Sequence, residues 1–176
     1  MQDPFAAVAA ASGPITTDDF NELLGRAGRV NGPALLFDAW IGRKISQETL
    51  AAHIGPVWSG AEYPDRAVDR GSWRAMFRRA GFTVDGVPAT RPDEPIRLWR
   101  GSVPARRRDW SWTTERAIAE GYAAGTAARR PNGLIYTVLA PPAALLCANP
   151  TERNEAEFVI DTRGLRIHEA PSAAAA

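Results

Sequence analysis

Apolar residues in the first half of the chain recur at the spacing of amphipathic helices. Residues 16–27 begin with Thr and Asp residues that can cap a helix, and their apolar residues fall on one face. The same periodicity predicts a second helix beginning at Pro33, a third that begins at Ser46 and stops at Gly55-Pro56, and a fourth over residues 72–80. We therefore expect a mostly helical part over residues 15–85.

The second half carries shorter apolar runs with the composition of strands. These runs cover residues 96–100, 134–140, 157–161 and 165–168, and a helical pattern over residues 114–125 interrupts them. Such an order indicates an α+β fold with a mostly antiparallel sheet, preceded by the helical half.

The distribution of Pro, Gly and Ala divides the chain further. A proline-rich linker over residues 89–95 separates the helical part from a β-rich part over residues 95–168. We expect one domain over residues 15–170, with a flexible arm over residues 1–14 and a disordered tail over residues 171–176.

Charge and hydropathy exclude several classes of protein. Of 176 residues, 21 are Lys or Arg and 20 are Asp or Glu, so the net charge of +1 is too small to drive general nucleic-acid binding. Lys44 is the only lysine, a bias typical of a GC-rich bacterial or phage genome, and the cluster Arg106-Arg107-Arg108 is expected to be a solvated loop. No apolar run reaches the ~20 residues that cross a bilayer, so we expect a cytoplasmic protein without membrane contact.

Few residues could bind a metal or form a disulfide. Cys147 is the only cysteine, and His53 and His168 are the only histidines, so neither a disulfide nor a zinc cluster is expected. Cys147 is expected to be a small buried side chain and both histidines to be structural. The chain also lacks the glycine-rich phosphate loops and the nucleophile elbow of common enzyme families.

Three separated motifs in the second half carry candidate chemistry. Leu98-Trp99-Arg100-Gly101 ends the first predicted strand, and Trp110-Ser111-Trp112-Thr113 precedes the predicted helix. Glu155-Ala156-Glu157-Phe158-Val159-Ile160 opens a later apolar strand. In this order the motifs resemble the Arg-Ser-Glu branch of the ADP-ribosyltransferase superfamily, over about residues 95–168.

The resemblance implies an enzyme that uses NAD as a substrate, releases nicotinamide and transfers ADP-ribose to a macromolecular acceptor, without a metal. Glu157 would bind the ribose 2′-hydroxyl and stabilise the positive charge that develops on the ribose. Glu155, two residues earlier and on the same strand face, would act on the acceptor. Glutamate at this position goes with arginine acceptors in the family, so protein arginine is the expected target.

The remaining site residues are expected around the same dinucleotide. Arg100 would bind the diphosphate, because a guanidinium can grip phosphate oxygens bidentately. Strand alternation puts Arg100 on one face with Ile96 and Leu98, and Arg97 on the other, which favours Arg100. Ser111 would bind the nicotinamide ribose or orient the catalytic glutamate.

Four more residues complete the expected NAD site. Gly101 would let its backbone approach the nicotinamide amide, and Trp112 stands where the family often has a small residue. Thr113 is either the second hydroxyl of the motif or the N-cap of the following helix. Tyr122 either stacks on nicotinamide or belongs to the core.

Other functions remain open at this stage. The same fold could modify nucleic acid, for which Arg106-Arg107-Arg108 could form a local patch, or hydrolyse NAD. A non-catalytic binding module that works through its helices is an alternative hypothesis from another functional class. The loop over residues 147–154 has no aromatic residue and does not identify the acceptor, and the biological role, as a bacterial or phage effector or a toxin-like protein, is not fixed by the sequence.

Overall fold

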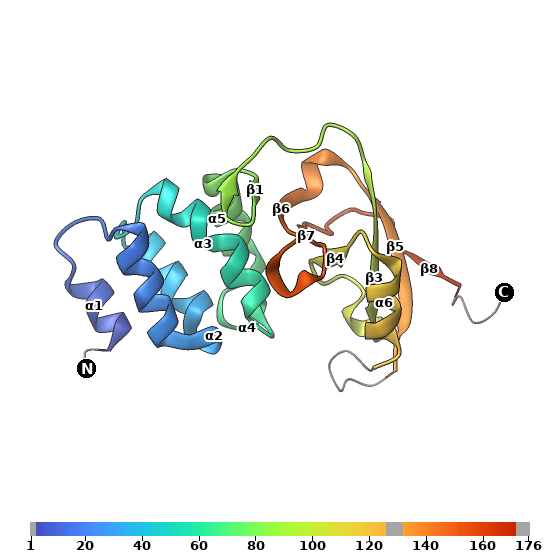
Figure 1. Cartoon of the computed structure of the whole chain (residues 1–176), viewed down its shortest axis with the longest axis horizontal. Helices are drawn as coiled ribbons and strands as arrows, with labels where there is room; N and C mark the ends of the chain where they lie inside the picture. The colour runs from blue at the N-terminus through green and yellow to red at the C-terminus, as the bar shows by residue number, and fades with distance from the viewer. Residues whose placement is uncertain (1–2, 126–131, 172–176) are drawn as a thin grey trace. The chain divides into compact units, whose positions relative to one another are not determined.

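The computed structural model describes residues 3–125 and 132–171, and the chain divides into two compact units, Met1–Thr90 and Arg91–Ala176 (Figure 1). The first unit contains α1 to α5 and a small hairpin, and the second contains α6 and strands β3 to β8. The protein is therefore α+β, with helices preceding strands, as the sequence predicts. The boundary between the two units falls inside the predicted linker over residues 89–95.

The helices of the first unit follow one another through short connections. They are α1 (Pro4–Ala10), α2 (Thr17–Ile41), α3 (Gln47–Gly60), α4 (Pro64–Ala67) and α5 (Arg70–Ala80). The expectation of a flexible arm over residues 1–14 was wrong, because α1 forms there. Asp3 caps α1 by accepting a hydrogen bond from the Phe5 amide, Pro4 occupies the first turn, and the helix buries Val8.

Two helix boundaries differ from the sequence pattern. The first two predicted helices are joined in α2, across a kink at Gly28, whose φ of 73° only glycine adopts easily. The predicted stop at Gly55-Pro56 was wrong, since α3 continues through Pro56 to Gly60. Pro56 has no N–H to donate to the Ala52 carbonyl, and that oxygen instead packs against Gly86, closer than a Cβ would permit.

Aromatic side chains form the core of the helical unit. The Trp58 and Trp73 rings meet edge to face with their centroids 5.1 Å apart, and Phe77 packs beside both. The Trp73 indole nitrogen donates to the Pro64 carbonyl at 3.1 Å, so the buried ring has its polar group satisfied. The unit ends in a hairpin of β1 (Thr83–Val84) and β2 (Val87–Pro88).

The second unit is built on an antiparallel sheet. Its strands are β3 (Ile96–Ser102), β4 (Ser111–Thr113), β5 (Leu134–Ala140), β6 (Leu145–Asn149), β7 (Glu157–Ile160) and β8 (His168–Ala170). They lie in the order β6-β7-β4-β3-β5-β8, and each of these neighbouring pairs is antiparallel. Helix α6 (Arg116–Ala123) packs across β3 (Figure 1), and short 3-10 turns occupy Pro104–Arg106, Pro142–Ala144 and Glu152–Asn154.

The strand predictions were partly right. The run over residues 134–140 is β5, whereas the strand expected over residues 165–168 begins only at His168. Strand β6 was missed, because its residues 147–149 were assigned to the loop before the Glu-x-Glu motif. Residues 172–176 of the expected tail lie outside the described part of the chain.

Candidate active site

The strand register gathers several predicted site residues on one face of the sheet. Glu157 on β7 lies directly between Asn149 on β6 and Thr113 on β4. Thr113 in turn pairs with Trp99 on β3. Directly paired residues on neighbouring strands project to the same side, so these four side chains share a surface, which we call the Glu157 face.

Glu157 is a buried carboxylate with a defined partner. Its exposed fraction is 8%, and the Asn149 side-chain nitrogen donates to its Oε2 at 3.3 Å. Asn149 is itself fully buried, and the same nitrogen lies 3.5 Å from the sulfur of Cys147, which is buried as expected. Asn149 is thus a positioning residue for Glu157 that the sequence did not indicate.

Glu155 reaches the site by a different route from the one expected. It precedes β7 in a turn where Arg153, Asn154 and Ala156 have φ values of 54°, 54° and 46°, so it does not extend the strand face of Glu157. The prediction that the two glutamates share an extended strand was therefore wrong. Instead, the Tyr122 hydroxyl donates to Glu155 Oε1 at 2.6 Å.

Thr113 fixes the same turn from β4. Its hydroxyl donates to the Glu155 carbonyl at 2.8 Å and accepts a hydrogen bond from the Glu115 amide at 3.0 Å. The N-cap of α6 is Glu115, so Thr113 does not cap this helix, and its hydroxyl joins β4 to the Glu155 turn. Tyr122 likewise contacts the Glu155 turn through its hydroxyl, and its stacking on nicotinamide stays a prediction.

Ser111 and Gly101 also lie on the Glu157 face. Ser111 is half-buried and pairs with Val159, two residues along β4 from Thr113. Gly101 lies beneath α6, where an added Cβ would overlap the Ala119 carbonyl oxygen. The space that the sequence assigned to nicotinamide at Gly101 is therefore filled by α6, and glycine is needed there for the helix to pack.

Arg100 projects to the face opposite Glu157, so the prediction that it contacts the dinucleotide was wrong. It follows Trp99 on β3 and, as predicted, shares a face with Leu98, but Leu98 is fully buried and this face is the core. The guanidinium donates to the Ser111 carbonyl at 2.6 Å, the Arg106 carbonyl at 3.1 Å and the Asp109 carboxylate at 3.1 Å. Arg100 thus holds the β3–β4 connection together.

Two further predictions change at this connection. Trp112 is 2% exposed and donates its indole N–H to the Asp109 carbonyl at 2.7 Å, so it belongs to the core rather than to a cofactor site. The arginine cluster is also not wholly solvated, because Arg106 donates to the Asp109 carboxylate at 2.6 Å and Arg108 to the Thr162 carbonyl at 3.3 Å. Asp109 is the shared acceptor that the sequence did not identify.

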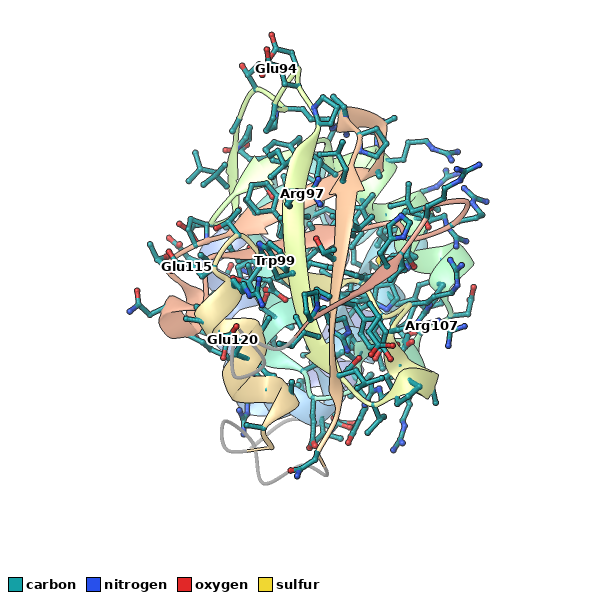
Figure 2. The ribbon with its side chains drawn as sticks, turned by 90° about the vertical axis from the view of Figure 1, so that its right-hand side faces the viewer. Glu94, Arg97, Trp99, Arg107, Glu115 and Glu120 are labelled. Atoms are coloured by element: carbon teal, nitrogen blue, oxygen red, sulfur yellow. The ribbon has the colours of Figure 1, made fainter. Side chains whose placement is uncertain are left out.

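The edge of the Glu157 face nearest α6 is polar and aromatic. The guanidinium of Arg116 lies 5.1 Å from the centre of the Trp99 ring and forms an ion pair of 2.9 Å with Glu120. Figure 2 shows Trp99 on β3 next to the helix that carries Glu120. Within the described residues, no three His, Cys, Asp or Glu side chains gather as a metal site would require.

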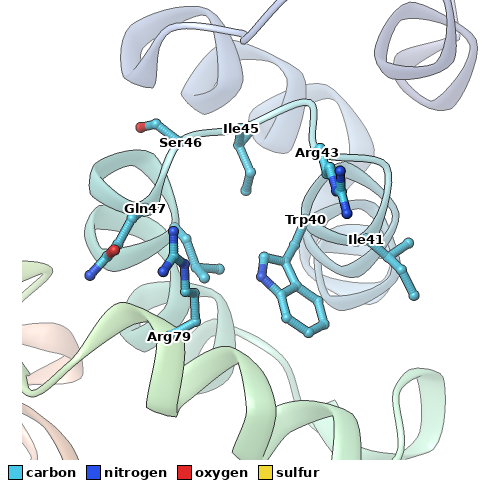
Figure 3. Close-up of a pocket in the computed structure, with 8 residues that line it drawn as sticks. Trp40, Ile41, Arg43, Ile45, Ser46, Gln47 and Arg79 are labelled. Atoms are coloured by element: carbon cyan, nitrogen blue, oxygen red, sulfur yellow. The ribbon is translucent and has the colours of Figure 1, made fainter.

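The helical unit contains a separate cavity of about 480 Å³ (Figure 3). It lies between the end of α2 and the start of α3, and Arg79 of α5 borders it. Trp40 is half-buried at its wall, and none of the predicted site residues lines the cavity.

Comparisons with known proteins do not identify a relative. No protein-family model matches the chain, and neither the curated proteins nor the solved structures gave a significant match. Among the described residues, no helix combines the length and apolar character needed to cross a bilayer.

Proposed function

We propose that the second unit is a mono-ADP-ribosyltransferase, which cleaves NAD between nicotinamide and ribose and transfers ADP-ribose to a macromolecule. The observation that carries this proposal is the grouping around Glu157. Its buried carboxylate sits beside the Thr113 hydroxyl, which binds the backbone of Glu155, and the Glu155 carboxylate is held by Tyr122. Glycosyl transfer requires an anion near the ribose and a base near the acceptor, and this grouping supplies both.

Glu157 acts on the bond that breaks. As nicotinamide leaves with the bonding electron pair, positive charge develops on the ribose, and an anion about 4 Å away contributes about 4 kcal/mol at an effective dielectric constant of ~20. That energy corresponds to roughly a thousandfold in rate. Burial limits screening of the carboxylate by water, and Asn149 fixes its orientation.

Glu155 acts on the acceptor, for which protein arginine is the first candidate. A carboxylate can align an incoming guanidinium and accept its proton as the nitrogen forms the new bond to the ribose C1′. The Tyr122 hydroxyl holds one carboxylate oxygen of Glu155 at 2.6 Å and so limits its rotation. The transfer balances, with nicotinamide as the leaving group and the acceptor proton passing to Glu155.

The proposal is tested by incubating the protein with NAD labelled in the adenosine half and a bacterial lysate. Wild type should label macromolecules, and Glu157→Gln should reduce labelling at least a hundredfold. Glu94→Gln, which alters an exposed carboxylate on the linker (Figure 2), is the matched control and should behave as wild type. Equal labelling by wild type and Glu157→Gln would overturn the assignment.

Digesting the labelled product identifies the acceptor class. Protease sensitivity supports a protein acceptor, and nuclease sensitivity would move the target to nucleic acid. Nicotinamide release without labelled polymer would show that the acceptor is water, and no NAD binding at all would favour a non-catalytic module.

A further inference from the structure

Of the two arginines on β3, Arg97 lies on the Glu157 face and Arg100 does not. It is two residues before Trp99 on β3, and alternation along a strand puts both side chains on the same side. Thr137, which pairs with Trp99, lies on this face as well, and the Arg97 guanidinium donates to its hydroxyl at 3.4 Å. Figure 2 shows Arg97 and Trp99 in succession along β3.

Arg97 differs from Arg100 and Arg116 in its charged contacts. Arg100 is 11% exposed and ion-paired with Asp109, and Arg116 is ion-paired with Glu120. Arg97 is exposed, and its long bond to a neutral hydroxyl leaves its positive charge uncompensated by that contact. Among the described residues no salt bridge holds Arg97, so an anion that reaches this surface meets a guanidinium that need not first give up an acidic partner.

The separation between Arg97 and Glu157 suits the length of the substrate. The two residues are two strands apart and two residues out of line, which places their Cα atoms about 12 Å from each other for ordinary strand spacing and rise. Both side chains extend from the same face, so a glutamate at the ribose and an arginine at the phosphates can bind one dinucleotide together. Guanidinium groups bind phosphate oxygens bidentately.

We propose that Arg97, rather than Arg100, binds the diphosphate of NAD in this chain. The inference rests on the proposed transferase function and on the sheet register. It makes Arg97 a binding residue, whose loss weakens substrate affinity without removing the groups that act at the ribose.

The test compares Arg97→Gln with Arg107→Gln in nicotinamide-release kinetics. Arg107 is an exposed arginine whose guanidinium bonds the Pro104 carbonyl and which lies away from Arg97 in Figure 2, so it is the matched control. Arg97→Gln should raise the KM for NAD about tenfold with kcat changed less than threefold, and should raise the inhibition constant of ADP-ribose similarly. Inhibition by nicotinamide, which has no phosphate, should be unchanged.

The outcomes separate this inference from the function on which it rests. If wild type releases nicotinamide and Arg97→Gln keeps the wild-type KM and ADP-ribose inhibition, Arg97 does not bind the diphosphate, and the transferase function stands. Equal rises in KM for Arg97→Gln and Arg107→Gln would also overturn it, since only general charge would matter. If wild type neither cleaves NAD nor binds ADP-ribose, both proposals fall.

Discussion

Replacing Arg100 with glutamine should destabilise the second unit rather than remove a substrate contact. The substitution deletes a guanidinium that bridges the Ser111 carbonyl, the Arg106 carbonyl and the Asp109 carboxylate. A glutamine amide is shorter and cannot reach all three acceptors. The β3–β4 connection, and with it the start of β4, should lose its main polar anchor.

The size of the effect follows from these contacts. Hydrogen bonds that involve a charged group contribute about 1.5–3 kcal/mol each, but Asp109 keeps its 2.6 Å bond to Arg106, so its charge is not left alone. The Arg106 carbonyl also keeps the Asp109 amide as a donor. Counting the lost hydrogen bonds and the lost ion pair, we expect a loss of about 3 kcal/mol in the free energy of unfolding. For a unit of this size, that lowers the melting temperature by roughly 15 °C.

Thermal unfolding of the full chain measures this loss, and NAD kinetics below the transition measure substrate affinity. Arg107→Gln should melt within about 0.5 kcal/mol of wild type, as surface substitutions do. Arg100→Lys should fall between wild type and Arg100→Gln, because an ammonium cannot reproduce the forked geometry. A variant Arg100→Gln that melts like wild type but binds NAD poorly would refute the reasoning and return Arg100 to the substrate site.

Three further predictions concern backbone and titration. Gly101→Ala on β3 should destabilise the second unit by about 1–3 kcal/mol in thermal unfolding, because the added Cβ meets the Ala119 carbonyl of α6. Gly121→Ala on α6 places its Cβ in open space and should stabilise the unit by about 0.5–1 kcal/mol in the same measurement. Burial lowers the pKa of His53, outweighing the opposite effect of its backbone hydrogen bond, so the folded state disfavours its protonation. Stability of the helical unit should then be full above the ordinary pKa of ~6.5 and fall as the pH drops below it, and His53→Gln should flatten this dependence in melts at pH 7.5 and 5.5. Ala156→Gly should keep or raise stability by up to about 1 kcal/mol, since glycine adopts its φ of 46° without strain; a clear loss in urea unfolding would contradict a strained turn before Glu157.

The sequence predicted the type and order of most elements, because their hydrophobic periods are strong. It also selected Glu157, Glu155, Thr113 and Tyr122, which the structure brings together through hydrogen bonds and strand pairing. These residues stand in short motifs whose position relative to strand ends could be inferred locally.

The predictions that were wrong depended on the pairing of strands far apart in the sequence. The alternation of β3 correctly separated Arg97 from Arg100, but only the register with β4 and β7 tells which of the two faces carries Glu157. Asn149 was missed for the same reason, since its role requires β6 to lie beside β7. The left-handed turn before Glu157 contains no glycine, so the sequence carried no signal that would predict it.

The most direct test of the account is the rate of nicotinamide release from NAD by purified wild type and by Glu157→Gln, each checked for folding by its melting temperature. We expect release by wild type and a loss of about a thousandfold in Glu157→Gln, with a wild-type rate in Glu94→Gln. Equal rates in wild type and a folded Glu157→Gln, or no release by wild type, would contradict a catalytic carboxylate at this position.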